Sequence, residues 1–202
     1  AMELYTKYGG TVKAVCCWCQ TDQAAYTFVK EGGVNMNELL EITDRYGSIS
    51  KSKAGELGYE VLDGSQWLKQ DVDILVPAAL ENSITSENAG DIRDSVRIIV
   101  EGANGPTTPE ADQIIKEKEI MVIPDFLANA GGVICSYFEQ VQSNSNYFWP
   151  RDEVLGKLDD KMTEAFYSVM ELSKRRKISL RDAAYMIAIS RVAEACRLRG
   201  WV

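Results

Sequence analysis

Three short loops in this sequence carry the residues best suited to holding a flat polar ligand. Each loop directly follows a short apolar run, and each contains an asparagine: Asn82 in residues 77–82, Asn104 in 101–108 and Asn129 in 124–132. The residues around them are mostly small, which lets a ligand approach the backbone closely. Because an Asn side chain both donates and accepts hydrogen bonds, the pattern suits a nucleotide ribose or a carboxamide better than a bare ion.

An ordinary structural role accounts for the same residues when each loop is taken alone. Gly and Asn are common in turns, and Asn129 could serve only to cap the helix that follows it. Three such loops in succession weaken that interpretation, because ligands of parallel sheets bind beyond the carboxyl ends of the strands. Both interpretations stay open at this point.

The elements that must position these loops alternate between strand and helix. Three apolar runs have the length of buried strands: residues 73–76, 96–100 and 120–123. Between the last two, Thr108 and Pro109 favour a helix start, since Thr caps helices and Pro suits their first position. A short helix is also expected near Thr85. The alternation predicts β-α-β units and a parallel sheet.

The two ends of the chain differ from this middle part. Toward the N-terminus we expect four elements after the end of a helix at residues 2–8: strands at 11–17 and 59–62, a helix from 35 to about 46 and a short helix around 67. Beyond Ala130 the periodicity is helical throughout. It predicts helices at residues 131–142, 152–176 and about 180–198, with a polar-aromatic break at 143–150. Ser179 is expected to cap the last of these helices.

Composition excludes several classes of function. The net charge of −8 disfavours nucleic acid as the main partner, and the absence of His removes triad catalysis and the commonest metal ligand. No apolar run is long enough for a membrane span, and the start lacks the pattern of a secretory signal. Five cysteines, an odd number with three crowded together, favour a reducing, cytoplasmic setting. Cys16, Cys17 and Cys19 give zinc at most three ligands, so we expect free thiols and no metal.

The loops and the C-terminal segment resemble one enzyme family. The runs DILVPAALEN (73–82), VEGANGPTT (100–108) and IPDFLANAGGV (123–133), with the ending at residues 191–201, are similar to the glutamate dehydrogenase family, which includes leucine, phenylalanine and valine dehydrogenases. The likeness spans nearly the whole chain from Thr11 and keeps the family's order. It covers only the C-terminal, NAD(P)-binding domain of the family's subunit.

This resemblance implies an α/β fold, a Rossmann-like parallel sheet with a helical C-terminal extension. It implies NAD or NADP as cofactor and a small amino acid, glutamate by preference, as the substrate of oxidative deamination. Asn104 matches the residue near the nicotinamide ribose, Asn129 the residue beside the nicotinamide, and Ser136 the contact to the glutamate side chain. The loop lining the dinucleotide is matched by Ala78, Ala79 and Asn82. A structural alternative for Ser136 is a helix hydroxyl bonded to its own backbone.

Parts of the family's nucleotide site have no counterpart here. No Gly-x-Gly-x-x-Gly occurs, so we expect the first strand and the phosphate-binding loop to be missing and the cofactor site to be weakened or lost. Cys16 to Cys19 stand where the family carries a ribose-binding acid. Asp22 is the nearest acid and Lys30 the first base, which leaves NAD, NADP or neither open.

We therefore expect residues 1–150 to form a partial dinucleotide-binding domain and 151–202 a helical extension of it. The family's catalytic Lys and Asp lie in the other domain, so this chain is predicted to hold no catalytic residue and to be inactive alone. The alternative is a non-catalytic nucleotide-binding or self-associating module derived from that enzyme. Unpaired strand edges and bare apolar helix faces predict a homo-oligomer, most simply a dimer.

Overall fold

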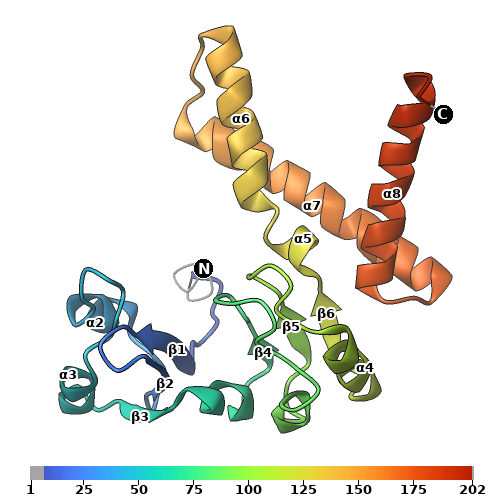
Figure 1. Ribbon diagram of the computed structural model, residues 1–202. Coiled ribbons are helices and arrows are strands. Elements are labelled where there is room, and N and C mark those ends of the chain that lie inside the picture. Colours follow the sequence, from blue (N-terminus) through green and yellow to red (C-terminus); the bar gives the residue numbers. More distant parts are fainter. Residues whose placement is uncertain (1–6, 202) are drawn as a thin grey trace. The chain divides into compact units, whose positions relative to one another are not determined.

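The computed structural model describes residues 7–201 of the chain (Figure 1). They form two compact units. Within the described residues, the N-terminal unit comprises 7–72 with 88–95, and the C-terminal unit comprises 73–87 with 96–201. The helix end expected at residues 2–8 lies mostly outside the described residues. The division expected at residue 150 stays a prediction.

The N-terminal unit is built on an antiparallel sheet. Its strands β1 (Ala14–Cys19), β2 (Ala24–Val29) and β3 (Glu60–Asp63) pair in that order. Short helices complete it: α2 (Met36–Glu41), α3 (Lys51–Glu56) and the 3-10 helices η1 (Gly64–Lys69) and η2 (Ala89–Asp91). The core gathers around Phe28, with Leu39, Ala54 and Tyr59 packed from the helices and from the entry to β3.

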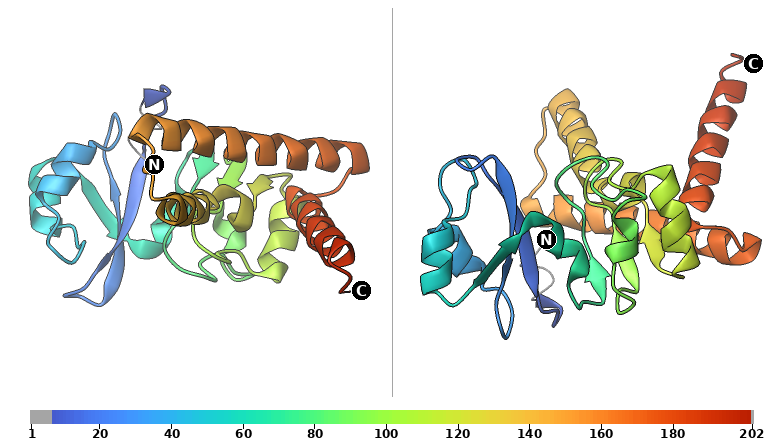
Figure 2. Two further views of the ribbon diagram at one scale, coloured as in Figure 1. Left: turned by 90° about the horizontal axis from the view of Figure 1, so that it is seen from above. Right: turned by 60° about the horizontal axis from the view of Figure 1, so that its bottom comes forward.

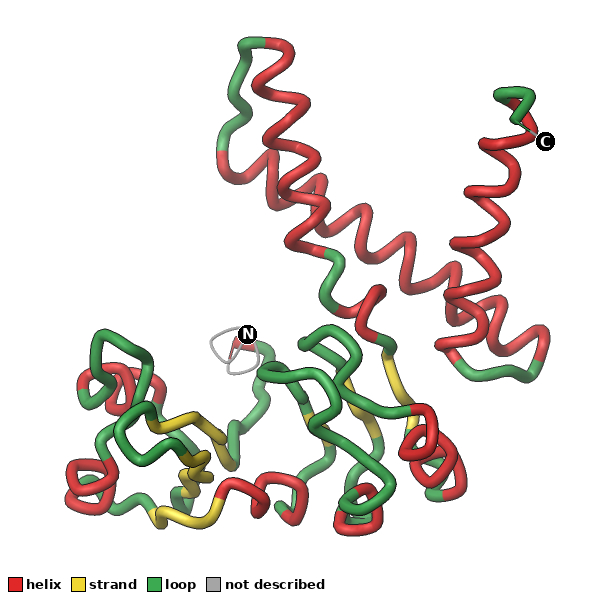
Figure 3. The backbone as a smooth tube through the Cα atoms, in the orientation of Figure 1, coloured by secondary structure: helices red, strands yellow, loops and turns green. Residues whose placement is uncertain are grey.

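Three expectations for this unit need correction. β1 begins three residues later than predicted and pairs with β2, which the sequence did not indicate, in an antiparallel hairpin (Figure 3). The helix capped by Asn35 ends at Glu41 rather than near residue 46, and α3 was not predicted. The strand near 59–62 and the short helix around Trp67 are confirmed as β3 and η1.

Gly64 packs closely against the backbone of Ala25 on β2. A Cβ atom there would lie 2.5 Å from the Cβ of Ala25 and 2.8 Å from its carbonyl oxygen. We predict that Gly64→Ala destabilises the unit by about 2 kcal/mol, because backbone atoms cannot move aside as a flexible side chain can. Urea unfolding followed by tryptophan fluorescence measures this loss.

Gly55→Ala is the matched control, since a Cβ at this helical position meets nothing within 4 Å. It should leave stability unchanged or raise it by about 0.5–1 kcal/mol, because Ala favours helix more than Gly. Equal losses for the two variants would contradict the close packing of Gly64 on β2.

The C-terminal unit contains the parallel sheet that the sequence predicted. Strands β4 (Ile74–Leu75), β5 (Ile98–Val100) and β6 (Met121–Ile123) pair in that order. Helix α4 (Pro109–Glu117) connects β5 to β6, capped as expected by the Thr108 hydroxyl. The short helix expected near Thr85 begins later, as the 3-10 helix η2, because Ile84 is extended and forms a parallel bridge with Thr107.

Beyond β6 the described chain is mainly helical (Figure 2). The helices are α5 (Asp125–Ala128), α6 (Gly131–Ser145), α7 (Arg151–Arg176) and α8 (Leu180–Leu198). The hydroxyl of Ser179 caps α8 by accepting from Asp182 N, as expected. Leu127, Val169 and Leu180 bury their side chains together, which packs α5, α7 and α8 into one core. The short α5, inside a segment expected as a loop, fixes where Asn129 lies.

Candidate functional site

The three predicted loops meet at the carboxyl edge of the parallel sheet. The carbonyl oxygen of Pro77 accepts hydrogen bonds from Gly102 N at 3.0 Å and Ala103 N at 2.9 Å. The amide of Asn82 donates to the carbonyl oxygen of Gly105 at 2.9 Å, with Asn82 in the left-handed conformation at φ 52°. The loop after β4 is therefore joined to the loop after β5 at both ends.

Small residues allow these two loops to touch. A Cβ atom at Gly102 would lie 3.1 Å from the Cβ of Ala78, closer than most side-chain contacts. A larger residue at either position would push the loops apart. Ala79, beside Ala78, is exposed, and no hydrogen bond joins it to the other site residues.

The centre of the site is a pair of side-chain amides from the second and third loops. Asn129 Nδ2 donates to Asn104 Oδ1 at 2.8 Å and to the carbonyl oxygen of Gly102 at 3.4 Å. Both hydrogens of that amino group are thereby used. Among the described residues no partner occupies Asn104 Nδ2 or Asn129 Oδ1, so the pair presents one free donor and one free acceptor.

A purely structural role for Asn129 as a helix cap does not match this geometry. Ala130, not Asn129, precedes α6, and no side chain caps that helix. Asn129 instead ends α5, where its backbone amide donates to Asp125 O at 2.8 Å. Its side chain is left to bind Asn104.

Behind the amide pair lies a buried ion-pair network that the sequence did not reveal. Glu101, the residue after β5, is fully buried and accepts two hydrogen bonds from Arg181 of α8, at 3.0 and 2.8 Å. Arg181 also donates to Asp112 Oδ1 at 3.3 Å. Burial opposes the charged guanidinium, but the hydrogen bonds and charges of Glu101 and Asp112 outweigh it, so the pKa of Arg181 is raised.

Ser136 stands apart from this constellation. It lies on α6, exposed, and its hydroxyl has no hydrogen-bond partner among residues 7–201. The backbone-bonded alternative is therefore not what the structure contains. Whether Ser136 contacts a substrate stays a prediction.

The end of β1 carries no acid that is free to bind a ribose. Asp22, in the turn after β1, forms an ion pair with Lys51, whose ammonium also lies 4.1 Å from the centre of the Tyr26 ring. The hydrogen bond from Lys51 lowers the pKa of Asp22. The carboxylate is thus already engaged by a cation.

The cysteines of β1 are free thiols held in backbone contacts. Cys17 Sγ donates to Gly47 O at 3.0 Å. Cys16 is exposed as a residue, yet its sulfur lies 3.6 Å from Gly64 O. Burial raises the pKa of both thiols, which reduces the thiolate fraction near neutrality. No cluster of three or more His, Cys, Asp or Glu able to hold a metal occurs within residues 7–201.

This thiol environment predicts a difference in reactivity. Iodoacetamide should alkylate Cys16 and Cys17 more slowly in the folded chain than in the urea-unfolded chain at about pH 8, since only the thiolate attacks. The difference should shrink as pH rises toward the raised pKa values. Peptide mass spectrometry measures each site, and equal rates in both states would contradict the burial of these sulfur atoms.

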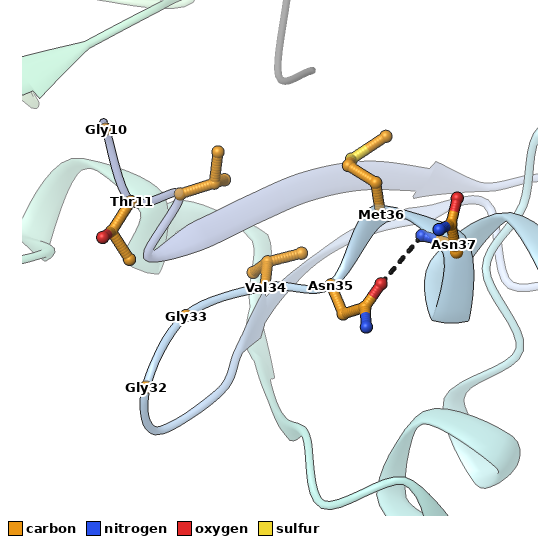
Figure 4. Close-up of a pocket in the computed structure, with 9 residues that line it drawn as sticks. Gly10, Thr11, Gly32, Gly33, Val34, Asn35, Met36 and Asn37 are labelled. Carbon is orange, nitrogen blue, oxygen red and sulfur yellow. Dashed lines mark hydrogen bonds between the residues drawn. The ribbon is translucent and has the colours of Figure 1, made fainter. Parts of the chain in front are cut away.

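Each unit contains a cavity that neither Asn104 nor Asn129 lines. One, of about 340 Å³, is lined mainly by apolar residues of β5, β6, α5 and α7 in the C-terminal unit. The other, of about 480 Å³, lies in the N-terminal unit between residues 10–12 and 32–37, where Asn35 Oδ1 accepts from Asn37 N (Figure 4). Neither includes a residue predicted for the site. No described helix is long and apolar enough to cross a membrane.

The fold and site place the C-terminal unit among α/β domains whose ligands bind beyond the carboxyl ends of parallel strands. Residues 1–200 match the model of the Glutamate/Leucine/Phenylalanine/Valine dehydrogenase family, and the chain belongs to that family. The chain is 48% identical over 169 residues to the NAD-specific glutamate dehydrogenase of Staphylococcus aureus, covering 84% of this chain and 39% of that protein.

Solved structures give the same result. A crystal structure of glutamate dehydrogenase from Peptoniphilus asaccharolyticus superposes with a TM-score of 0.77 at 35% identity, covering 100% of this chain and 44% of that one. The hetero-hexameric glutamate dehydrogenase from Thermus thermophilus, in a Leu-bound form, gives 0.84 at 26% identity, covering 98% and 44%. The chain thus spans about two fifths of the length of these relatives.

Proposed function

We propose that this chain forms the NAD-binding part of a glutamate dehydrogenase. The observation that carries the proposal is the Asn129–Asn104 hydrogen bond at the carboxyl edge of the parallel sheet. It leaves Asn104 Nδ2 as a free donor and Asn129 Oδ1 as a free acceptor among the described residues. A carboxamide offers the complementary acceptor and donor, and the nicotinamide ring carries such a group.

The residues at this edge fit the nicotinamide half of the cofactor. The lack of a side chain at Gly102 lets the loops of Gly102 and Ala78 pack closely, and the backbone amide of Asn82 is held by its bond to Gly105. Asn104 would donate to the carboxamide oxygen, and Asn129 would accept from its amino group. We extend the proposal to Ala79 as part of the lining and to Ser136 as a contact to the glutamate side chain. Bound NAD supplies the hydride acceptor in amino-acid oxidation.

The fit is weaker for the phosphate half. The sequence contains no Gly-x-Gly-x-x-Gly, and Asp22 is paired with Lys51 rather than free for a ribose. The relatives named NAD-specific favour NAD over NADP. The groups that move protons during deamination would come from the remainder of the enzyme, so we propose that this chain alone does not turn over glutamate.

A calorimetric titration with NAD tests the proposal. We expect a saturable site with a Kd of about 1 mM or tighter, and Asn129→Ala should weaken it by roughly tenfold, the effect of about one directed hydrogen bond. Asn144→Ala, an exposed residue of α6, is the control and should bind as the original chain does. If NAD does not bind to the unaltered chain at millimolar concentration, the proposal fails.

Exposed apolar side chains support the second candidate, self-association. Tyr185, Ile189 and Val192 recur along one side of α8 and are 51%, 64% and 64% exposed. We propose a homo-oligomer, most simply a dimer, whose mass light scattering at micromolar concentration would measure. The cytoplasmic location stays a prediction from cysteine usage.

A further inference from the structure

A continuous set of hydrogen bonds links helix α8 to the Asn104–Asn129 pair. It begins with the bidentate hydrogen bonds between Arg181 and Glu101, in which Nη1 donates to Oε2 and Nη2 to Oε1. The same Oε2 atom accepts from the backbone amide of Asp125 at 2.9 Å. One carboxylate oxygen therefore joins α8, the end of β5 and the start of α5.

Asp125 carries the connection to both asparagines. Its Oδ2 accepts from the amide of Gly105, the residue after Asn104, at 2.8 Å. Its carbonyl oxygen accepts from the amide of Asn129 at 2.8 Å. Its Oδ1 also lies 3.7 Å from Arg181 Nη1. Asp125 thus holds the backbone beside each member of the amide pair.

Packing alone does not require this arrangement. A buried ion pair is costly to desolvate, and apolar residues of similar volume often stabilise a fold as well or better. What the ion pair adds is direction, because the planar guanidinium fixes both carboxylate oxygens at once. Arg181 also faces three carboxylates, from Glu101, Asp112 and Asp125, so a single cation orders side chains from three segments of the chain.

We propose that Arg181 is a positioning residue for nicotinamide binding, acting through Glu101 and Asp125 to orient the Asn104–Asn129 pair. This inference rests on the proposed function for its ligand. The orientation of the two side-chain amides does not depend on the proposed function, because it exists without any ligand. The two parts can therefore be tested separately.

The first test needs no ligand. Arg181→Lys keeps a positive charge but loses the paired hydrogen bonds of the guanidinium to Glu101. Asp125→Ala removes the side-chain acceptor of the Gly105 amide, whereas Asp125→Asn keeps an acceptor oxygen. In nitrogen-proton NMR spectra, Arg181→Lys and Asp125→Ala should shift or broaden the side-chain amide signals of Asn104 and Asn129. Asp125→Asn should largely restore them. The amide of Gln142, bonded to Phe138 O within α6, should stay unchanged and reports that the unit is folded.

The second test separates positioning from general stability by the choice of ligand. ADP-ribose lacks the nicotinamide, so it does not use the amide pair. Arg181→Lys should raise the Kd for NAD roughly tenfold, which corresponds to about 1.4 kcal/mol. The Kd for ADP-ribose should change by less than about twofold. Arg197→Lys is the control on α8, because Arg197 is exposed and, among residues 7–201, pairs only with Glu194.

The outcomes divide cleanly. The inference is supported if the amide signals of Asn104 and Asn129 shift and the loss of binding affinity is confined to NAD. Unmoved Asn104 and Asn129 signals in Arg181→Lys overturn it, whatever the binding data. Equal losses of affinity for NAD and ADP-ribose also overturn it, since they indicate general damage to the folded unit. Moved signals in a chain that binds neither ligand keep the positioning role and reject the proposed function.

Discussion

Replacing Arg181 with Met should lower the free energy of unfolding of the C-terminal unit by about 3–5 kcal/mol. The substitution leaves Glu101, with no exposed surface, without its cation. Removing one partner of a buried pair costs more than the pair contributes, because the remaining charge has neither water nor a counterion. Urea unfolding followed by circular dichroism is the measurement, since most helical residues lie in this unit.

Two further variants show whether the loss comes from the stranded charge. Arg181→Met combined with Glu101→Gln removes both charges and should recover part of the loss, so the two effects should not add. Arg197→Met removes an arginine whose side chain is 69% exposed and should cost less than about 1 kcal/mol. Losses of the same size at Arg181 and Arg197 would rule out the buried pair as the cause.

The same residues explain how much of the site the sequence could predict. Asn82, Asn104 and Asn129 lie within seven residues of the ends of their strands, so a parallel sheet brings their segments to one edge, where α5 then fixes Asn129. Glu101 and Asp125 stand in the same predicted loops, yet nothing local distinguishes a buried carboxylate from a solvated one. Their partner Arg181 lies 80 and 56 residues further along the chain, and no spacing rule connects positions that far apart.

The fold divides in a similar way. Thr108, Pro109 and Ser179 fixed helix starts correctly because capping acts within one turn of the chain. β2 was missed because its sequence, AAYTFV, lacks a regular apolar-polar alternation, and two of its residues, Thr27 and Phe28, are both fully buried. Strand pairing depends on which partner lies alongside, so the strand expected at residues 11–17 did not indicate its antiparallel partner β2.

Phe28→Ala tests that missed strand and should cost the N-terminal unit about 3–5 kcal/mol. Phe28 is 1% exposed and packs among Leu39, Ala54 and Tyr59, while its backbone pairs with strands on both sides. The loss has two parts: the free energy gained by burying the aromatic ring away from water, and the cost of the cavity left behind. The cavity stays open because the strands paired on both sides of β2 hold the backbone in place. Urea unfolding followed by the fluorescence of Trp18 and Trp67, both in this unit, measures it.

Leu40→Ala is the matched control, because Leu40 neighbours the buried Leu39 on α2 yet is 63% exposed. Its truncation should change stability by less than about 0.5 kcal/mol. The contrast depends on β2 being the central strand of the sheet, where Phe28 points into the core. If residues 24–29 were instead a surface loop, both variants would unfold at the urea concentration of the original chain.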